Sequence, residues 1–354
     1  MNYWRLPLTF DQAEEIRKHD SVASVLEQCD NDAYPCYDPT TSLKWQEDVL
    51  PQLSYISWPD TEPRTPFSKV RDRYYFDDSD GKDIDVWIMD SGLTIEHPEF
   101  DHWSRDRVDW LIKVPDYDGV AREDDSQTDV DLKTKGKSHG TSMTSVIAGK
   151  TLGVAKSIKP HLARLPRRNN IGYWTQEDFI DTIAAIDERL ANDGGANGVL
   201  LLAHYYIRPA FYRLKGDGTA DPLLINGEPI DQSFGFEWRL HTIIQSIVEK
   251  GMLVITGSGN EPGKSTIDGW PQNYAKRDDS LRIPELLVVG AVQPDEPGDG
   301  VLGYGSTDLA QGLPHVYAPG HLVQAAEGNS NQWGGGGYYK RTSGSSIGKF
   351  HAHC

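Results

Sequence analysis

The chain has 354 residues and is 38% hydrophobic, enough to bury one large core with or without a smaller appendage. Its 35 basic and 53 acidic side chains give a net charge of -18, which repels phosphate backbones and anionic membranes and excludes nucleic acid as an expected partner. No apolar run approaches the roughly 18 residues that cross a bilayer, and the first residues lack the basic start and apolar core of a secretory signal.

The first 79 residues are predicted to form a small unit followed by a connector. Residues 10–19 carry apolar side chains at helical spacing, and the β-branched segment 21–26 follows at strand period. From residue 29 to about residue 66 the composition shifts to Pro, Asp, Thr and Ser, which predicts an exposed connector. The chain has three cysteines, Cys29, Cys36 and Cys354, which are too few to define a disulfide framework. Cys29 and Cys36 either form a disulfide that closes a small loop or remain free thiols.

Beyond residue 80, short apolar segments alternate with helix-like ones. Strands are predicted at 84–89, 198–203, 252–256 and 286–292, and helices around 141–148, 176–191 and 236–250. Strands separated by helices in this way form a parallel sheet with helices on both faces, so we predict an α/β fold. The acidic stretches 116–131 and 295–299 and the glycine run 334–337 are expected to be solvated insertions.

Asp90 lies at the carboxyl end of a predicted buried strand, before Ser91 and Gly92. In open α/β sheets functional groups gather at these strand ends, and a buried carboxylate beside a histidine fixes the imidazole tautomer. Taken alone, Asp-Ser-Gly is more often only a turn that ends a strand.

His139 begins a predicted helix whose apolar face is formed by Met143, Val146 and Ile147. A histidine at this position is held rigidly, and its pKa suits general-base work near neutrality. A lone histidine is more often structural, but this one belongs to the specific string His-Gly-Thr-Ser-Met-Thr-Ser-Val-Ile-Ala-Gly.

Asn260 follows another predicted strand through the small residues Gly257, Ser258 and Gly259. Small residues let a substrate backbone come close, and the asparagine amide can donate a hydrogen bond to an oxyanion. An asparagine in such a turn is usually only a turn former.

Ser346 lies in the small-residue string Thr342-Ser-Gly-Ser-Ser-Ile-Gly, ahead of a segment that can start a helix. The N–H groups of a helix N-terminus suit the same oxyanion, although Ser/Gly clusters are commonly plain loops. An acid, a base and a nucleophile in the chain order Asp, His, Ser match the order known for subtilisin.

With these motifs the chain resembles the subtilisin-like serine protease family (peptidase S8), particularly its proteinase K-like and fungal branches. Residues 86–100 are similar to the family's aspartate motif, including its His-Pro-acid-Phe tail, and residues 139–149 are similar to its histidine motif. Residues 343–348 align with the serine motif Ser-Gly-Thr-Ser-x-Ala, which makes Ser346 the nucleophile, whereas a frame on Ser343 would lose the preceding glycine. The resemblance implies the family's three-layer α/β fold and an Asp90, His139 and Ser346 triad, with Asn260 at the oxyanion.

The resemblance also implies a domain organisation. Residues 1–28 resemble the second half of an inhibitory propeptide, 29–79 form a linker with a processing region, and 80–354 form the peptidase domain. The missing first half of the propeptide and the missing signal suggest a truncated or degraded gene. Relatives of this branch are mostly secreted or vacuolar, and a peptide or protein substrate and the chain's own propeptide are the expected partners.

Three departures from the family bear on activity. The strand that in relatives carries Ser-Leu-Gly along the substrate continues here as Ala203, His204 and two tyrosines, so the first specificity pocket is expected to be reshaped or blocked by aromatic bulk. The chain stops eight residues after Ser346, where relatives continue through a buried helix, and each large apolar side chain left unburied costs about 2 kcal/mol. The third departure is Lys349-Phe350-His351, directly after the serine.

The first functional hypothesis is a serine endopeptidase that works through an acyl-enzyme, with substrate contacts at Ala203, His204, Gly257, Ser258 and Gly259. The alternative is a catalytically impaired subtilisin-like scaffold that binds peptide or a partner without turnover. A metal-dependent hydrolase is disfavoured because no HExxH or comparable ligand spacing occurs. No cofactor is required, and the acidic loops permit a structural calcium ion of the kind common in this family, with ligands that the sequence does not define.

Overall fold

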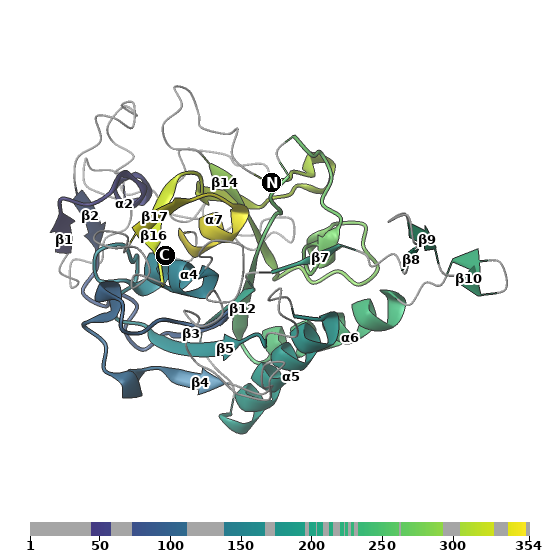
Figure 1. Cartoon of the computed structure of the whole chain (residues 1–354), viewed down its shortest axis with the longest axis horizontal. Helices are drawn as coiled ribbons and strands as arrows, with labels where there is room; N and C mark the ends of the chain where they lie inside the picture. Colours follow the sequence, from purple (N-terminus) through teal and green to yellow (C-terminus); the bar gives the residue numbers. More distant parts are fainter. Residues whose placement is uncertain are drawn as a thin grey trace, which may run out of the picture.

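The computed structural model describes residues 44–57, 73–111, 138–166, 174–194, 198–202, 204–207, 212–214, 220–222, 224–225, 228–229, 233–261, 263–292, 305–328 and 339–351 (Figure 1). Several predicted features lie outside these ranges, namely the helix 10–19, the strand 21–26, the three cysteines, both acidic stretches, the glycine run and Ala203.

A seven-stranded sheet in which every neighbouring pair is parallel forms the centre of the molecule. Its strands, in order across the sheet, are β15 (Val316–Pro319), β14 (Leu287–Val292), β12 (Met252–Gly257), β6 (Gly198–Leu202), β3 (Asp85–Asp90), β5 (Lys159–Arg164) and β4 (Asp109–Leu111). The predicted parallel sheet is thereby confirmed. Because β12, β6 and β3 are neighbours, the segments that follow them emerge at one edge of the sheet.

Helices cover both faces of this sheet, and the alternation of side chains along β3 explains why. Val86 and Ile88 point into one apolar cluster, while Trp87 and Met89 point into a second cluster on the opposite face. Each fully buried side chain of this kind stabilises the fold by about 1.5–3 kcal/mol. The result is the expected three-layer arrangement of helices, sheet and helices.

The two helical layers differ in what they carry (Figure 1). On one face lie α4 (His139–Ala148) and α7 (Ser345–His351), which pack against each other and against the sheet. On the other face lie α5 (Gln176–Asn192) and α6 (Ser233–Glu249). The predicted histidine and serine segments therefore lie in one layer, on the same face of the sheet.

Residues 44–57 correct the prediction of an exposed connector. They form β1 (Lys44–Glu47), which pairs antiparallel with β2 (Arg73–Phe76), and the short helix α2 (Pro51–Ile56). Val49 and Leu53 are buried in the same core cluster as α4, and the Gln52 side chain donates to the Gln324 carbonyl. The abundant polar residues concealed these apolar positions, which anchor the segment to the sheet domain.

The remaining described elements are short. They are the 3-10 helices η2 (Pro98–Phe100), η3 (Arg105–Arg107), η4 (Gln272–Ala275) and η5 (Leu309–Gln311), and the strands β7 (Tyr206–Ile207), β8 (Tyr212–Leu214), β9 (Ala220–Pro222), β10 (Leu224–Ile225), β11 (Glu228–Pro229), β13 (Gly269–Trp270), β16 (Val323–Ala326) and β17 (Tyr339–Thr342). Strands β16 and β17 form an antiparallel pair, and β16 contacts α4 while β17 leads into α7. This pair therefore connects the two helices that carry the histidine and the serine.

Candidate active site

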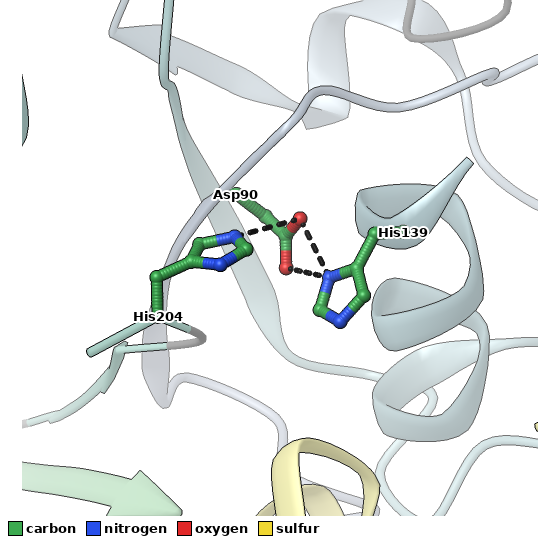
Figure 2. Close-up of side chains that lie close together, drawn as sticks. All are labelled: Asp90, His139 and His204. Atoms are coloured by element: carbon green, nitrogen blue, oxygen red, sulfur yellow. Dashed lines mark hydrogen bonds and ion pairs between the residues drawn. The ribbon is translucent and has the colours of Figure 1, made fainter. Parts of the chain in front are cut away.

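Asp90 and His139 meet at the carboxyl end of the sheet. Asp90 is the last residue of β3 and its side chain is only 2% exposed, whereas His139 is the first residue of α4 and is 33% exposed. The His139 Nδ1 atom lies 2.9 Å from each oxygen of the Asp90 carboxylate (Figure 2). The other ring nitrogen, Nε2, is therefore directed away from the carboxylate.

The backbones of the two motifs touch, and this contact explains their glycines and hydroxyls. A Cβ atom on Gly140 would lie 2.1 Å from the Gly92 carbonyl oxygen, so only glycine permits this approach. The Gly140 N–H donates to the Ser91 hydroxyl at 2.9 Å, and the Thr94 N–H donates to the Thr141 hydroxyl at 2.9 Å. These contacts lock the start of α4 against the turn after β3.

The charge state of Asp90 follows from its surroundings. Burial opposes ionisation, but the charge and hydrogen bond of His139, together with the hydrogen bond of His204, outweigh burial and lower the pKa of the Asp90 carboxyl well below its usual range. The Ser91 N–H also donates to its Oδ1 atom at 2.7 Å. Because an ionised carboxylate only accepts hydrogen bonds, the neutral form of the His139 ring donates to it from Nδ1 and has the Nε2 lone pair available.

His204 is a second imidazole on the same carboxylate. It follows β6, the neighbour of β3, and its Nε2 atom lies 3.6 Å from Asp90 Oδ1. Figure 2 shows Asp90 between the two histidines, whose ring centroids are 5.2 Å apart. The ring of Trp174 packs edge-on against the His204 ring, with the ring centroids 4.2 Å apart. The sequence predicted that His204 lies along the substrate strand, but it did not predict the contact with Asp90. The available signal for that contact was the position of His204 shortly after β6, the strand next to β3.

Ser346 is the second residue of α7 and is partly exposed. The missing Cβ of Gly344 would lie 3.0 Å from the Ser346 hydroxyl oxygen, and 3.2 and 3.5 Å from the two side-chain atoms of Asn260. Ser346 and Asn260 therefore flank the same small space. Among the described residues, His139 is hydrogen-bonded to Asp90, and no hydrogen bond joins it to Ser346.

Asn260 is tied to α7 by the residue before Ser346. Its Oδ1 atom accepts from the Ser345 N–H at 2.7 Å and from the Ser345 hydroxyl at 3.1 Å. The amide nitrogen Nδ2 lies 3.5 Å from the position of a Cβ on Gly344, beside the space next to Ser346. Ser345 is buried, so this contact also fixes the first turn of α7 against the end of β12.

The three small residues before Asn260 are buried and have partners inside the protein. The Gly259 N–H donates to the Ser345 hydroxyl, the Gly257 carbonyl accepts from Gln272, and the Ser258 N–H donates to the Val289 carbonyl. Their predicted contact with substrate stays a prediction. Their observed contacts hold the strand end against α7, η4 and β14.

Glu99, in the His-Pro-acid-Phe tail of the aspartate motif, has a structural explanation. Its side chain is 1% exposed and accepts from the N–H groups of Thr151 and Leu152, from the Thr151 hydroxyl and from the Tyr339 hydroxyl. These donors follow α4 and begin β17. One buried carboxylate therefore joins the segments on either side of the site.

The comparisons with known proteins concern the family and the fold of the chain. The family model described as "Subtilase family" matches residues 81–348. The chain belongs to the subtilase family. The match includes Asp90, His139, His204, Asn260 and Ser346.

Curated relatives of this subtilase include fungal proteases. It is 27% identical over 172 residues to alkaline protease 2 of Aspergillus fumigatus, covering 48% of this chain and 28% of that protein. It is 34% identical over 257 residues to a subtilisin-like protease of Coccidioides posadasii, covering 72% of this chain and 52% of that protein. The chain thus spans about a quarter to a half of these relatives' length.

Solved structures with a similar fold include a cold-adapted subtilisin-like serine proteinase, with a TM-score of 0.55 and 18% identity over 86% of this chain and 82% of that one. Sphericase gives a TM-score of 0.51 and 15% identity over 85% of this chain and 80% of that chain. At these identities the likeness concerns the fold alone, which is subtilisin-like as expected. No helix in the described part of the chain is long and apolar enough to cross a membrane.

Proposed function

We propose that this subtilase is a serine endopeptidase in which Asp90, His139 and Ser346 form the catalytic triad. The observation that carries the proposal is the buried Asp90 carboxylate with both oxygens 2.9 Å from His139 Nδ1. An imidazole held in this tautomer and orientation is a general base at Nε2. The packing of α4 against α7 supports Ser346 as the residue whose proton it removes.

The reaction would follow the acyl-enzyme route. His139 Nε2 takes the Ser346 proton as the hydroxyl oxygen attacks the peptide carbonyl, and the Asp90 charge stabilises the imidazolium that forms. His139 then gives the proton to the leaving amine, which breaks the peptide bond and leaves an ester on Ser346. Water, deprotonated by the same nitrogen, hydrolyses that ester and restores the free enzyme.

Asn260 is proposed to stabilise the oxyanion. Its Oδ1 atom is occupied by Ser345, which leaves Nδ2 to donate toward the space that it shares with Ser346. The first N–H groups of a helix lack acceptors within the helix, so the Ser346 N–H is a second donor candidate. Both donors are set before substrate binds.

Contacts of the neighbouring serines favour Ser346 as the nucleophile. Ser345 is buried and donates to Asn260, and the Ser343 hydroxyl accepts from the Leu322 N–H at 2.9 Å. Ser346 is partly exposed and borders the space next to Asn260. The hydroxyl with room for an acyl group is therefore that of Ser346.

The proposed substrates are peptides or proteins, in line with the protease names of the relatives. Inhibition by residues 1–28, secretion or vacuolar delivery, and a structural calcium ion remain proposals that rest on the family resemblance. His204 and Tyr205 follow β6, and their aromatic side chains are proposed to reshape or block the first specificity pocket.

A fluorophosphonate probe tests the proposal. We expect one label per chain on Ser346, located by mass spectrometry, and its loss in Ser346→Ala and His139→Ala. Ser343→Ala is the matched control and should label at the wild-type rate. If folded wild-type protein, with a cooperative thermal transition, takes no label and does not cleave casein, the endopeptidase proposal is refuted and a non-catalytic scaffold is favoured.

A further inference from the structure

The carboxylate at the centre of the site has two imidazole neighbours, whereas the triad chemistry uses only one of them. Asp90 contributes two oxygens, His139 contributes Nδ1 and His204 contributes Nε2, and one ligand atom from each residue lies within 4.8 Å of the others (Figure 2). Among the described residues this is the one cluster of three histidine, cysteine or acidic side chains with such spacing.

From this juxtaposition we infer that Asp90, His139 and His204 bind a zinc ion, and that the bound ion switches the proposed peptidase off. The ligand is a borderline divalent cation of the Zn²⁺ type, because two imidazoles with one carboxylate match its preference and differ from the all-oxygen ligands of calcium.

The distances fit such an ion with little rearrangement. Zinc holds nitrogen and oxygen ligands at about 2.0–2.2 Å, so two ligands of one tetrahedral ion lie about 3.3 Å apart. Asp90 Oδ1 lies 2.9 Å from His139 Nδ1 and 3.6 Å from His204 Nε2, on either side of that value. The upper limit of 4.8 Å within the cluster leaves at most about 1.5 Å for the side chains to close.

Neighbouring groups already orient two of the three ligands. The Ser91 N–H donates to Asp90 Oδ1 at 2.7 Å, and the Trp174 ring packs edge-on against His204. Trp174 directly precedes Thr175, whose reciprocal hydrogen bonds with Asp178 fix the start of α5. Outer contacts of this kind hold metal ligands in place. The His139 side chain is 33% exposed and gives an ion access from solvent, whereas the His204 Nε2 atom is itself buried.

Zinc at this position would inhibit through the tautomer of His139. The neutral ring carries one proton, which the Asp90 carboxylate keeps on Nδ1 in the active state. A zinc ion bonded to Nδ1 moves that proton to Nε2, and Nε2 then has no lone pair to accept the Ser346 proton. The ion also neutralises the negative charge of Asp90, which would otherwise stabilise the imidazolium. This inhibitory step rests on the proposed function, whereas the binding step does not.

Calorimetric titration of the full chain with zinc chloride, without substrate, tests the binding step. We expect a saturable site with one ion per chain, unchanged in Ser346→Ala because the serine is not a ligand. His204→Gln keeps a polar side chain of similar reach but removes the imidazole, and we expect its zinc affinity to fall by at least about 10-fold, since losing even an outer partner costs about 10–100-fold. His102→Gln, at an exposed histidine outside the cluster, is the matched control and should bind as wild type does.

The proposal is overturned if the wild-type chain has no saturable zinc site, a result that needs no variant, or if folded His204→Gln binds zinc as tightly as wild type. For inhibition, zinc should slow fluorophosphonate labelling of Ser346 at least about 10-fold, a chelator should restore it, and His204→Gln should lose this sensitivity. If no protein labels even without zinc, the proposed endopeptidase function fails, while the calorimetric result still decides the metal site.

Discussion

Replacement of Gly140 by alanine tests whether the close approach of α4 to the turn after β3 creates the site. The added Cβ would lie 2.1 Å from the Gly92 carbonyl oxygen and 2.9 Å from its nitrogen, although ordinary contact begins at 3.4 Å. Both atoms belong to the backbone, so no side chain can rotate away. The start of α4 must therefore move by more than about 1 Å, comparable to a displacement that costs about 100-fold in rate.

We expect the Gly140→Ala variant to fold with stability reduced by about 1–3 kcal/mol, which is typical of overpacking. Its rate of fluorophosphonate labelling at Ser346 should fall about 100-fold, because His139 no longer keeps its geometry against Asp90. Labelling time courses and urea unfolding measure the two quantities separately.

The matched control is Gly235→Ala on α6, where a Cβ would meet no atom within 4 Å. An alanine inside a helix should raise stability by about 0.5–1 kcal/mol and leave labelling unchanged. Wild-type labelling by folded Gly140→Ala would refute the reasoning, because it would mean that the Asp90 and His139 pair tolerates the displacement.

Three further predictions concern other parts of the molecule. Asn260→Ala should reduce casein turnover by about 10²–10³-fold, as expected for an oxyanion donor, and an unchanged rate would remove the residue from that role. Leu53→Ala should lower the free energy of unfolding, measured in urea, by about 2–5 kcal/mol. The control Leu309→Ala, at a 79% exposed position, should change it by less than about 0.5 kcal/mol. Equal effects of the two substitutions would contradict the anchoring of α2. Burial and the charge of Glu99 raise the pKa of Tyr339 to about 12. Because an unfolded phenol ionises near pH 10, the stability that this group contributes below pH 10 should be lost as the pH rises from about 10 to 12, and Tyr339→Phe should abolish that part of the pH dependence.

The sequence allowed prediction of the elements that are buried on both faces. Strands such as β6 and β14 are continuous apolar runs because helices cover both sides of the sheet, so their composition alone revealed them. By contrast, β5 has the sequence Lys-Pro-His-Leu-Ala-Arg, with a proline and charged ends that resemble a loop. It is a strand because β3 and β4 pair with it on either side, a tertiary contact that propensity does not contain.

The candidate site was partly predictable for a related reason. The motifs predicted Asp90, His139, Asn260 and Ser346 one at a time, since each lies near the end of a strand or the start of a helix. The contact of His204 with Asp90 depends on β6 lying beside β3, and the order of strands across a sheet does not follow from their order in the chain. The buried position of Glu99 likewise depends on donors that lie far away in the sequence.

The Glu99 contact with Tyr339 also bears on how the protein is made. These two residues are separated by 240 positions, and Glu99 belongs to the motif that also carries Asp90. On the ribosome, β3 and α4 emerge long before β17 and α7, so Glu99 must wait for the Tyr339 hydroxyl until nearly all of the described chain has been synthesised. Asp90 and His139 can therefore come together in an incomplete molecule, before α7 has been synthesised. Under the proposed function, the catalytic triad would be complete only after α7 has joined them.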